Sequence, residues 1–265
     1  LFGRFMVKHI LAIDDVEEDF SKILKWAIEF KRLWKEGDEV AMNFLPLDTL
    51  AIGSIYEKPS TRTRVSFEVG INRLGGYPLT LLKNDIQLGK SETVGDTSQV
   101  LSRFLGAMTY RCYAHADVEE LAKHAEVPVI NALSDKHHPC QAAADLMTIM
   151  EHFDDVSKLK VAWVGDGNNV LHDLMLACAM LGIDIHYAIP EGYEPSEEVV
   201  KKRKTEDPED PNTNLSFENK RIIDQQSLFR IIKNILSNKN ETSYIIENID
   251  MIIKMCPSRV WCRVF

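Results

Sequence analysis

The sequence lacks the features that would mark a membrane protein, a disulfide-stabilised protein or a nucleic-acid-binding protein. No apolar run reaches the roughly 18 residues that would span a membrane. The five cysteines are odd in number and form no C-x-x-C pair, which favours reduced thiols over a disulfide framework or a zinc site. The formal net charge of −9 lacks the basic excess of most nucleic-acid binders. Because charge interrupts residues 1–15 too early for a secretory signal, we expect a cytoplasmic protein that binds neither membrane nor nucleic acid.

Glycine and alanine are absent from residues 193–265, although the first 192 residues hold all 13 glycines. Ten isoleucines lie between residues 221 and 253. The charged, proline-bearing stretch 201–214 predicts a loop or a disordered segment. Its basic start, KKRK, is either a targeting signal or a solvated helix end. The chain is therefore expected to be atypical, and incomplete as a domain, from about residue 193.

Short apolar runs alternate with amphipathic segments along residues 17–190. The runs are expected to form strands at 49–56, 77–82, 107–113 and 127–133, and the segments between them helices at 17–34, 61–76, 92–105 and 117–125. Residues 158–190 predict a further strand, helix and strand, and a long apolar helix after His138 would link two halves. This alternation predicts an α/β fold with parallel sheets in two Rossmann-like domains, residues 1–150 and 151–265.

The stretch EKPSTRTR, residues 57–64, concentrates hydroxyl and cationic side chains where a strand turns into a helix. The backbone N–H groups at a helix start are unpaired, and the helix dipole makes that end positive. Hydroxyls and a guanidinium added to those amides would form a phosphate-sized anion site. The alternative is a helix cap at Ser60 followed by solvated arginines.

Two other loop-to-helix junctions carry polar residues. The first, HHPCQ at 137–141, could suggest a metal, but adjacent histidines point in different directions and no carboxylate has suitable spacing, so no metal is expected and His137 is interpreted as structural. The second, GDGNN at 165–169, lacks the third glycine of a dinucleotide fingerprint. Its asparagines are candidates for hydrogen bonds to a polar substrate.

Taken in order, the motifs EKPSTRTRVSFE, DTSQVLSR, YRCY, HPCQAAADLMTI and GDGNNVLHDLM resemble the aspartate/ornithine carbamoyltransferase family over residues 8–200. GDGNNV and HPCQ are similar to the ornithine-using branch. The resemblance implies a transferase that moves the carbamoyl group of carbamoyl phosphate to the side-chain amine of L-ornithine. The products would be L-citrulline and phosphate, in arginine biosynthesis or catabolism. The alternatives are a carbamoyltransferase for putrescine or aspartate and a non-catalytic relative that binds carbamoyl phosphate.

The family pattern also implies roles for individual residues. The phosphate would be held by Ser60, Thr61, Arg62 and Thr63. Arg111 would bridge the phosphate and the carbonyl oxygen, His138 and Thr63 would polarise that carbonyl, and Gln141 would hold the NH₂ group. The catalytic residues are thus expected to be Arg111, His138 and Thr63. An amine would attack the carbonyl carbon while the donors stabilise the oxyanion, without metal or organic cofactor.

The remaining implications concern the acceptor and the assembly. Asn169 matches the asparagine that binds the backbone groups of the amino acid, and Gln87 matches a loop that reaches into a neighbouring subunit's site. A homotrimer, or a higher assembly of trimers, is therefore expected, with each active site in an interdomain cleft. Lys58 would support the phosphate loop or be a plain surface lysine.

The resemblance weakens after residue 193. An Asp-x-x-x-Ser-Met-Gly loop and a His-Cys-Leu-Pro segment should follow, and neither is present; KMCPSR at 254–259 is a faint echo of the second. The chain also ends before the family's closing helix, and Asp173 stands where serine is usual. The shifted composition suggests the hypothesis of a changed reading frame. If sequencing of the coding DNA found no alternative frame that encodes the missing motifs, the hypothesis would be wrong.

Overall fold

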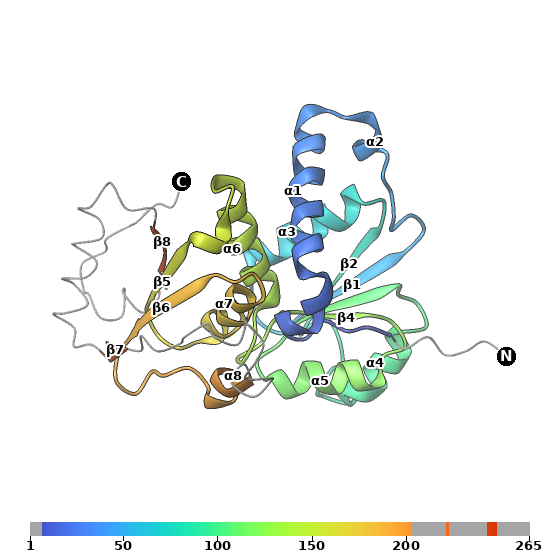
Figure 1. Cartoon of the computed structure of the whole chain (residues 1–265). Helices are drawn as coiled ribbons and strands as arrows, with labels where there is room; N and C mark the ends of the chain where they lie inside the picture. Colours follow the sequence, from blue (N-terminus) through green and yellow to red (C-terminus); the bar gives the residue numbers. More distant parts are fainter. Residues whose placement is uncertain (1–6, 203–220, 223–242, 248–265) are drawn as a thin grey trace. The chain divides into compact units, whose positions relative to one another are not determined.

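The computed structural model describes residues 7–202, 221–222 and 243–247 (Figure 1). These residues divide into two compact units, with the boundary between Met147 and Thr148. Each unit is built on a four-stranded parallel sheet, and helices connect the strands of the first unit. The predicted α/β fold with parallel sheets is therefore confirmed. Most of the isoleucine-rich stretch 221–253 and most of the charged stretch 201–214 lie outside the described residues.

The first unit follows the predicted alternation of strands and helices. In chain order its elements are η1 (Ile13–Asp19), α1 (Phe20–Glu36), α2 (Glu39–Met42), β1 (Ala51–Tyr56), α3 (Thr61–Arg73), β2 (Tyr77–Leu82), α4 (Val94–Leu101), β3 (Ala107–Arg111), α5 (His115–His124), β4 (Val129–Leu133) and the start of α6 (Pro139–His152). Helix α3 ends as expected before two glycines, and Gly75 takes the left-handed backbone conformation (φ +86°) that favours glycine.

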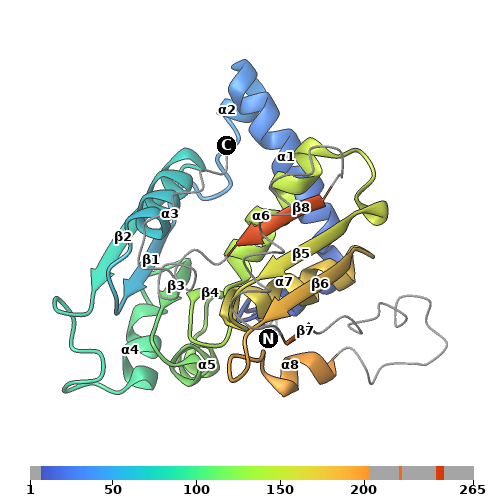
Figure 2. The same ribbon diagram turned by 90° about the vertical axis from the view of Figure 1, so that its left-hand side faces the viewer.

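The strand order of the first sheet is β2-β1-β3-β4. The chain passes from β1 to β2 in one direction and then returns to β3 on the other side of β1, so the order reverses between β1 and β3. Because parallel crossovers are right-handed, α3 covers one face of the sheet and α4 and α5 cover the other (Figure 2). In such sheets, ligands bind outside the carboxyl ends of the strands at this reversal.

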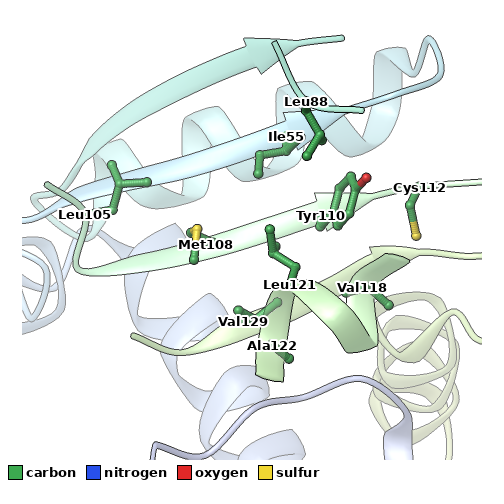
Figure 3. Packing of buried hydrophobic residues seen from close by; sticks show 10 residues of the cluster. All are labelled: Ile55, Leu88, Leu105, Met108, Tyr110, Cys112, Val118, Leu121, Ala122 and Val129. Atoms are coloured by element: carbon green, nitrogen blue, oxygen red, sulfur yellow. The ribbon is translucent and has the colours of Figure 1, made fainter. Parts of the chain in front are cut away.

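The core of the first unit lies between the sheet and α5. Figure 3 shows side chains from the inner strands meeting those of the helix, and the cluster consists of Ile55, Leu88, Leu105, Met108, Tyr110, Cys112, Val118, Leu121, Ala122 and Val129. Eight of these ten are at most 2% exposed. Burial raises the pKa of the Cys112 thiol to about 12, so it stays protonated at neutral pH. The core thereby fixes β3, whose last residue is Arg111.

Helix α1 confirms the helix expected at 17–34, although residues 17–19 belong to η1 instead. Its apolar residues recur at helical spacing, but only Phe20 and Leu24 are buried. Trp26 is 54% exposed and stacks on Phe30, with ring centroids 5.2 Å apart, while Phe44 meets both rings edge-on. The period correctly identified a helix but did not distinguish core residues from an exposed aromatic cluster.

The second unit contains the remainder of α6, then η2 (Val156–Lys158), β5 (Lys160–Val164), α7 (Asn169–Met180), β6 (Asp184–Ile189), α8 (Glu197–Lys202), β7 (Arg221–Ile222) and β8 (Ser243–Glu247). The strand order is β7-β6-β5-β8, so it also reverses, here between β5 and β8. Helix α7 is buried all round from Leu171 to Ala179, including His172 and Asp173. It is therefore an internal helix rather than a surface helix with one buried face.

Candidate functional site

The EKPSTRTR stretch lies where β1 ends and α3 begins. Ser60 is the N-cap residue, with an extended backbone, but its side chain makes no capping hydrogen bond to any described amide. Ser60 is therefore the N-cap residue that the alternative expected, without a capping hydrogen bond from its side chain. The first-turn N–H groups of Thr61, Arg62 and Thr63 are left to bind another acceptor, and a helix N-terminus favours an anion.

Arg111 meets this helix start from the neighbouring strand. It is the last residue of β3 and is in register with Tyr56, the last residue of β1. Its Nη1 donates to the Thr63 hydroxyl at 3.4 Å. The two residues come from positions 48 apart in the sequence and meet at the reversal of strand order. The structure thus brings Arg111 and Thr63 together at the sheet edge where ligands bind.

The cations at this edge destabilise one another. Burial, and then the charge of Arg111, lower the pKa of Lys58. Burial also lowers the pKa of the Arg111 guanidinium, and the charge of Arg62 lowers it further, against an opposing effect of Tyr56. Arg111 is half-buried, and its Nε is buried without a hydrogen-bond partner among the described residues. An anionic ligand would relieve this repulsion and give the guanidinium an acceptor.

Glu57 was not singled out from the sequence, although it holds the loop that carries these cations. Its Oε1 accepts from Lys83 Nζ at 3.0 Å and its Oε2 from the backbone N–H of Tyr113 at 3.0 Å. The side chain is only 8% exposed. Lys58 and Lys83 lie over the Tyr113 ring, 5.0 and 5.6 Å from its centroid. Glu57 therefore connects the segments that follow β1, β2 and β3. Its sequence signal was an acid between a buried strand and a cationic turn.

The loop from Leu133 to Pro139 carries the histidine pair. Ser134 N donates to the His137 carbonyl at 3.0 Å, and His137 N donates to Ser134 Oγ at 3.1 Å. The side-chain Nδ2 of Asn131 donates to Ser134 Oγ at 3.2 Å and to the His137 carbonyl at 3.3 Å. The His137 ring is buried, 5.0 Å from the His115 ring. This loop is a closed hydrogen-bonded turn, and it fixes the position of the buried His138, which directly precedes α6.

Gln141 lies in the first turn of α6 and is exposed. Its Nε2 donates to Asp145 Oδ1, one turn further along, at 2.9 Å. Asp145 was not noticed in the sequence, although its i,i+4 spacing from Gln141 was a signal.

Gln87 lies in the loop after the edge strand β2 and is exposed. Its Oε1 accepts from Ser91 Oγ at 3.2 Å, and its carbonyl accepts from the backbone of Lys90 and Glu92. Within the described part of the chain, its hydrogen bonds stay inside this loop and reach neither Arg111 nor the start of α3. Its predicted role across a subunit boundary stays a prediction.

In the second unit, GDGNN joins β5 to α7. Asn168 is the helix cap, with Oδ1 accepting from Val170 N at 3.0 Å and Leu171 N at 3.3 Å, so this asparagine is structural. Asn169 is the first helical residue and is half-buried. A Cβ at Gly167 would overlap the backbone nitrogen of Pro195, so only glycine allows this approach of two backbones. Asn169 is therefore held at the strand-order reversal of the second sheet.

Two features are absent from the part of the chain that the structure describes. No three His, Cys, Asp or Glu side chains are grouped there so that they could hold a metal ion. None of the helices in that part of the chain is both long and apolar enough to cross a membrane. Cys112, Cys140 and Cys178 form no disulfide, whereas Cys256 and Cys262 lie outside the described residues.

Comparison with protein families gives two adjacent matches. The model described as aspartate/ornithine carbamoyltransferase, carbamoyl-P binding domain, matches residues 8–151. The model described as aspartate/ornithine carbamoyltransferase, Asp/Orn binding domain, matches residues 157–229. The second match extends past residue 193, where the composition changes. The hypothesis of a changed reading frame remains untested.

Individual proteins give the same result. The ornithine carbamoyltransferase of Anoxybacillus flavithermus is 47% identical over 198 residues, which are 74% of this chain and 62% of the relative. That of Methanococcus aeolicus is 41% identical over 253 residues, 94% of this chain and 79% of the relative. The solved ornithine carbamoyltransferase from Pyrococcus furiosus is similar with a TM-score of 0.70 and 50% identity, over 73% of this chain and 61% of that one. The chain spans about three fifths of the first and third proteins.

Proposed function

Since the chain belongs to the aspartate/ornithine carbamoyltransferase family, we propose that it transfers the carbamoyl group of carbamoyl phosphate to the side-chain amine of L-ornithine. The products are L-citrulline and phosphate. The observation that carries this proposal is that Arg111 contacts Thr63 at the start of α3, which has no side-chain cap. The charges of Arg111 and Arg62 repel each other there, and a bound anion would relieve the repulsion. The names of the relatives and solved structures support the choice of ornithine.

In this proposal the donor is bound by the first unit. The phosphate takes hydrogen bonds from the hydroxyls of Ser60 and Thr61, from the first N–H groups of α3 and from the Arg62 guanidinium. Such charge-assisted hydrogen bonds are roughly twice as strong as neutral ones. Arg111 bridges the phosphate and the carbonyl oxygen, which accounts for a half-buried guanidinium whose Nε has no acceptor among the described residues.

The chemistry is an acyl transfer. The neutral amine of ornithine attacks the carbonyl carbon, and a C–N bond forms while the carbonyl oxygen gains negative charge. Arg111, His138 and Thr63 donate hydrogen bonds to that oxygen. The bond from carbon to the phosphate oxygen then breaks, phosphate leaves, and the amine nitrogen loses a proton. Removing one donor to an oxyanion typically lowers kcat by about 10²–10³.

The acceptor is assigned to the second unit, where Asn169 binds the amino-acid backbone groups. The division of labour between residues 1–150 and 151–265 is supported by the two family matches. A shared site in a cleft between the units, a homotrimer or assembly of trimers with Gln87 reaching a neighbour, a cytoplasmic location and a place in arginine metabolism remain part of the proposal.

A second candidate function is donor binding without transfer. It is favoured by the absence of the Ser-Met-Gly and His-Cys-Leu-Pro motifs from the sequence. Such a chain would bind carbamoyl phosphate and give no product with ornithine, putrescine or aspartate.

The test is citrulline formation by the purified 265-residue chain with carbamoyl phosphate and ornithine. We expect product, and a loss of about 100-fold or more in Arg111→Ala at an unchanged melting temperature. Product with another amine but not with ornithine would replace the acceptor. Binding of carbamoyl phosphate without any product would establish the second candidate, and a folded chain that binds no donor would refute both.

A further inference from the structure

The hydrogen bond between Gln141 and Asp145 determines which end of the Gln141 side-chain amide faces Asp145. An amide has a donating NH₂ end and an accepting oxygen, whereas an ionised carboxylate only accepts. Nε2 faces Asp145 Oδ1 at 2.9 Å, because the opposite orientation would place two oxygens against each other. Gln141 Oε1 is therefore turned away from Asp145 and remains an acceptor on an exposed side chain at the start of α6.

Asp145 is an unfavourable place for a carboxylate. The residue is half-buried, and its Oδ2 is buried without a hydrogen-bond partner among the described residues. Burial raises the pKa of this carboxyl to about 6, against the opposing effect of the Gln141 hydrogen bond. At neutral pH the group is still mostly ionised. A buried charge that is so weakly compensated points to a role beyond stability.

We propose that Asp145 is a positioning residue that holds the Gln141 amide with Oε1 toward the ligand, so that the site selects a donor whose acyl carbon carries NH₂. This inference rests on the proposed function, in which Gln141 contacts the carbamoyl NH₂. That NH₂ group can only donate. An amide turned the other way would present NH₂ to NH₂, so the orientation of Gln141 decides whether this hydrogen bond forms.

A matched pair of ligands isolates this hydrogen bond. Phosphonoacetamide and 2-oxopropylphosphonate both carry a phosphonate and a carbonyl, and they differ in having NH₂ or CH₃ on the carbonyl carbon. Neither is hydrolysed during a titration. Isothermal titration of the full chain with each ligand gives an affinity ratio. The phosphonate contacts contribute equally to both affinities, and the stronger acceptor oxygen of the amide contributes the same factor in every variant, so a change of the ratio between variants reports the NH₂ contact. We expect the wild-type chain to prefer phosphonoacetamide by about tenfold or more, as one buried hydrogen bond to a ligand provides.

The variants differ in the hydrogen-bond acceptor that position 145 presents to Gln141 Nε2. Asp145→Leu removes the acceptor and is expected to reduce the preference to less than about threefold through weaker phosphonoacetamide binding alone. Asp145→Asn keeps one acceptor oxygen and is expected to lie between Asp145→Leu and wild type. Glu120→Gln changes a different i,i+4 pair, with His124 on α5, and is expected to leave the ratio unchanged.

A double-mutant cycle separates positioning from a general effect on the fold. In a Gln141→Ala background the preference is already lost, and we expect Asp145→Leu to change it no further. An unchanged ratio in Asp145→Leu, or an equal loss with and without Gln141, would overturn the inference. If Asp145→Leu does not fold, an Asp145→Asn ratio equal to wild type would overturn it in the same way. If wild type binds neither phosphonate, the proposed donor site itself is wrong. This result differs from all the others, in which wild type binds and only the role of Asp145 is in question.

Discussion

The unfavourable charge at Asp145 predicts that replacing it stabilises the protein in a pH-dependent way. Burial raises the pKa of this carboxyl from its ordinary 3.8 to about 6. A carboxyl whose pKa is higher in the folded than in the unfolded state destabilises the fold wherever the unfolded state ionises it. The destabilisation has its full size at pH values above the pKa of the folded state. It disappears as the pH falls toward the pKa of the unfolded state.

The size of the effect follows from the two pKa values. A shift of about two units corresponds to about 3 kcal/mol at pH 8, which falls to about 1.5 kcal/mol at pH 5 and about 0.5 kcal/mol at pH 4. Asp145→Asn removes the charge and keeps the shape. Its other effects, such as a buried NH₂ in place of Oδ2, do not depend on pH. The free energy of unfolding of the variant relative to wild type should therefore rise by about 2.5 kcal/mol between pH 4 and pH 8.

Urea denaturation of both proteins at pH 4, 5, 6.5 and 8 measures this difference. The other carboxyls titrate in both proteins and cancel in the comparison. Asp155→Asn is a control for which the free energy of unfolding relative to wild type should fall, not rise, with increasing pH. The reason is that a hydrogen bond from Lys158 lowers the pKa of the Asp155 carboxyl. A difference between Asp145→Asn and wild type that stays constant across the pH range would refute the reasoning.

Two further predictions concern the turn after β1. Arg62→Ala should weaken binding of inorganic phosphate by about 10–100-fold, the effect of a lost charge-assisted hydrogen bond, whereas Arg64→Ala should change it less than about threefold because that guanidinium is exposed and paired with Glu68. Equal effects of the two in titration calorimetry would contradict the site. Glu57→Gln should lower the free energy of unfolding by about 1–3 kcal/mol, because it weakens the hydrogen bonds that Lys83 and the Tyr113 N–H donate to a nearly buried carboxylate. Denaturation of this variant at the wild-type urea midpoint would show that Glu57 is not needed to hold the loop.

The sequence predicted most of the fold because its strands and helices are short and alternate regularly. The strand 77–82 was predicted with its observed bounds, and the helix before Gly75 ends where a left-handed residue is required. The exposure of Trp26 could not be predicted in this way, because the spacing that identifies a helix does not show what packs against it.

The site was partly predictable for a similar reason. The cationic turn and the Arg111 strand were visible as motifs, and the structure brings Thr63 and Arg111 together. The contacts of Glu57 join segments 26 and 56 residues apart, and no local pattern predicts which acid makes them. The pair of Gln141 and Asp145 has ordinary helical spacing, so only the burial of the carboxyl distinguishes it from a surface pair.

The hydrogen-bonded turn before α6 has a consequence for the entropy of binding. Fixing the backbone of a flexible residue costs about 1–2 kcal/mol, and a ligand that orders a loop loses that amount of affinity for each residue. Here Asn131 and Ser134 already tie the His137 backbone in place. A ligand that reaches His138 therefore meets a loop whose conformational entropy was lost when the domain folded. The free energy of that contact remains available for holding the ligand.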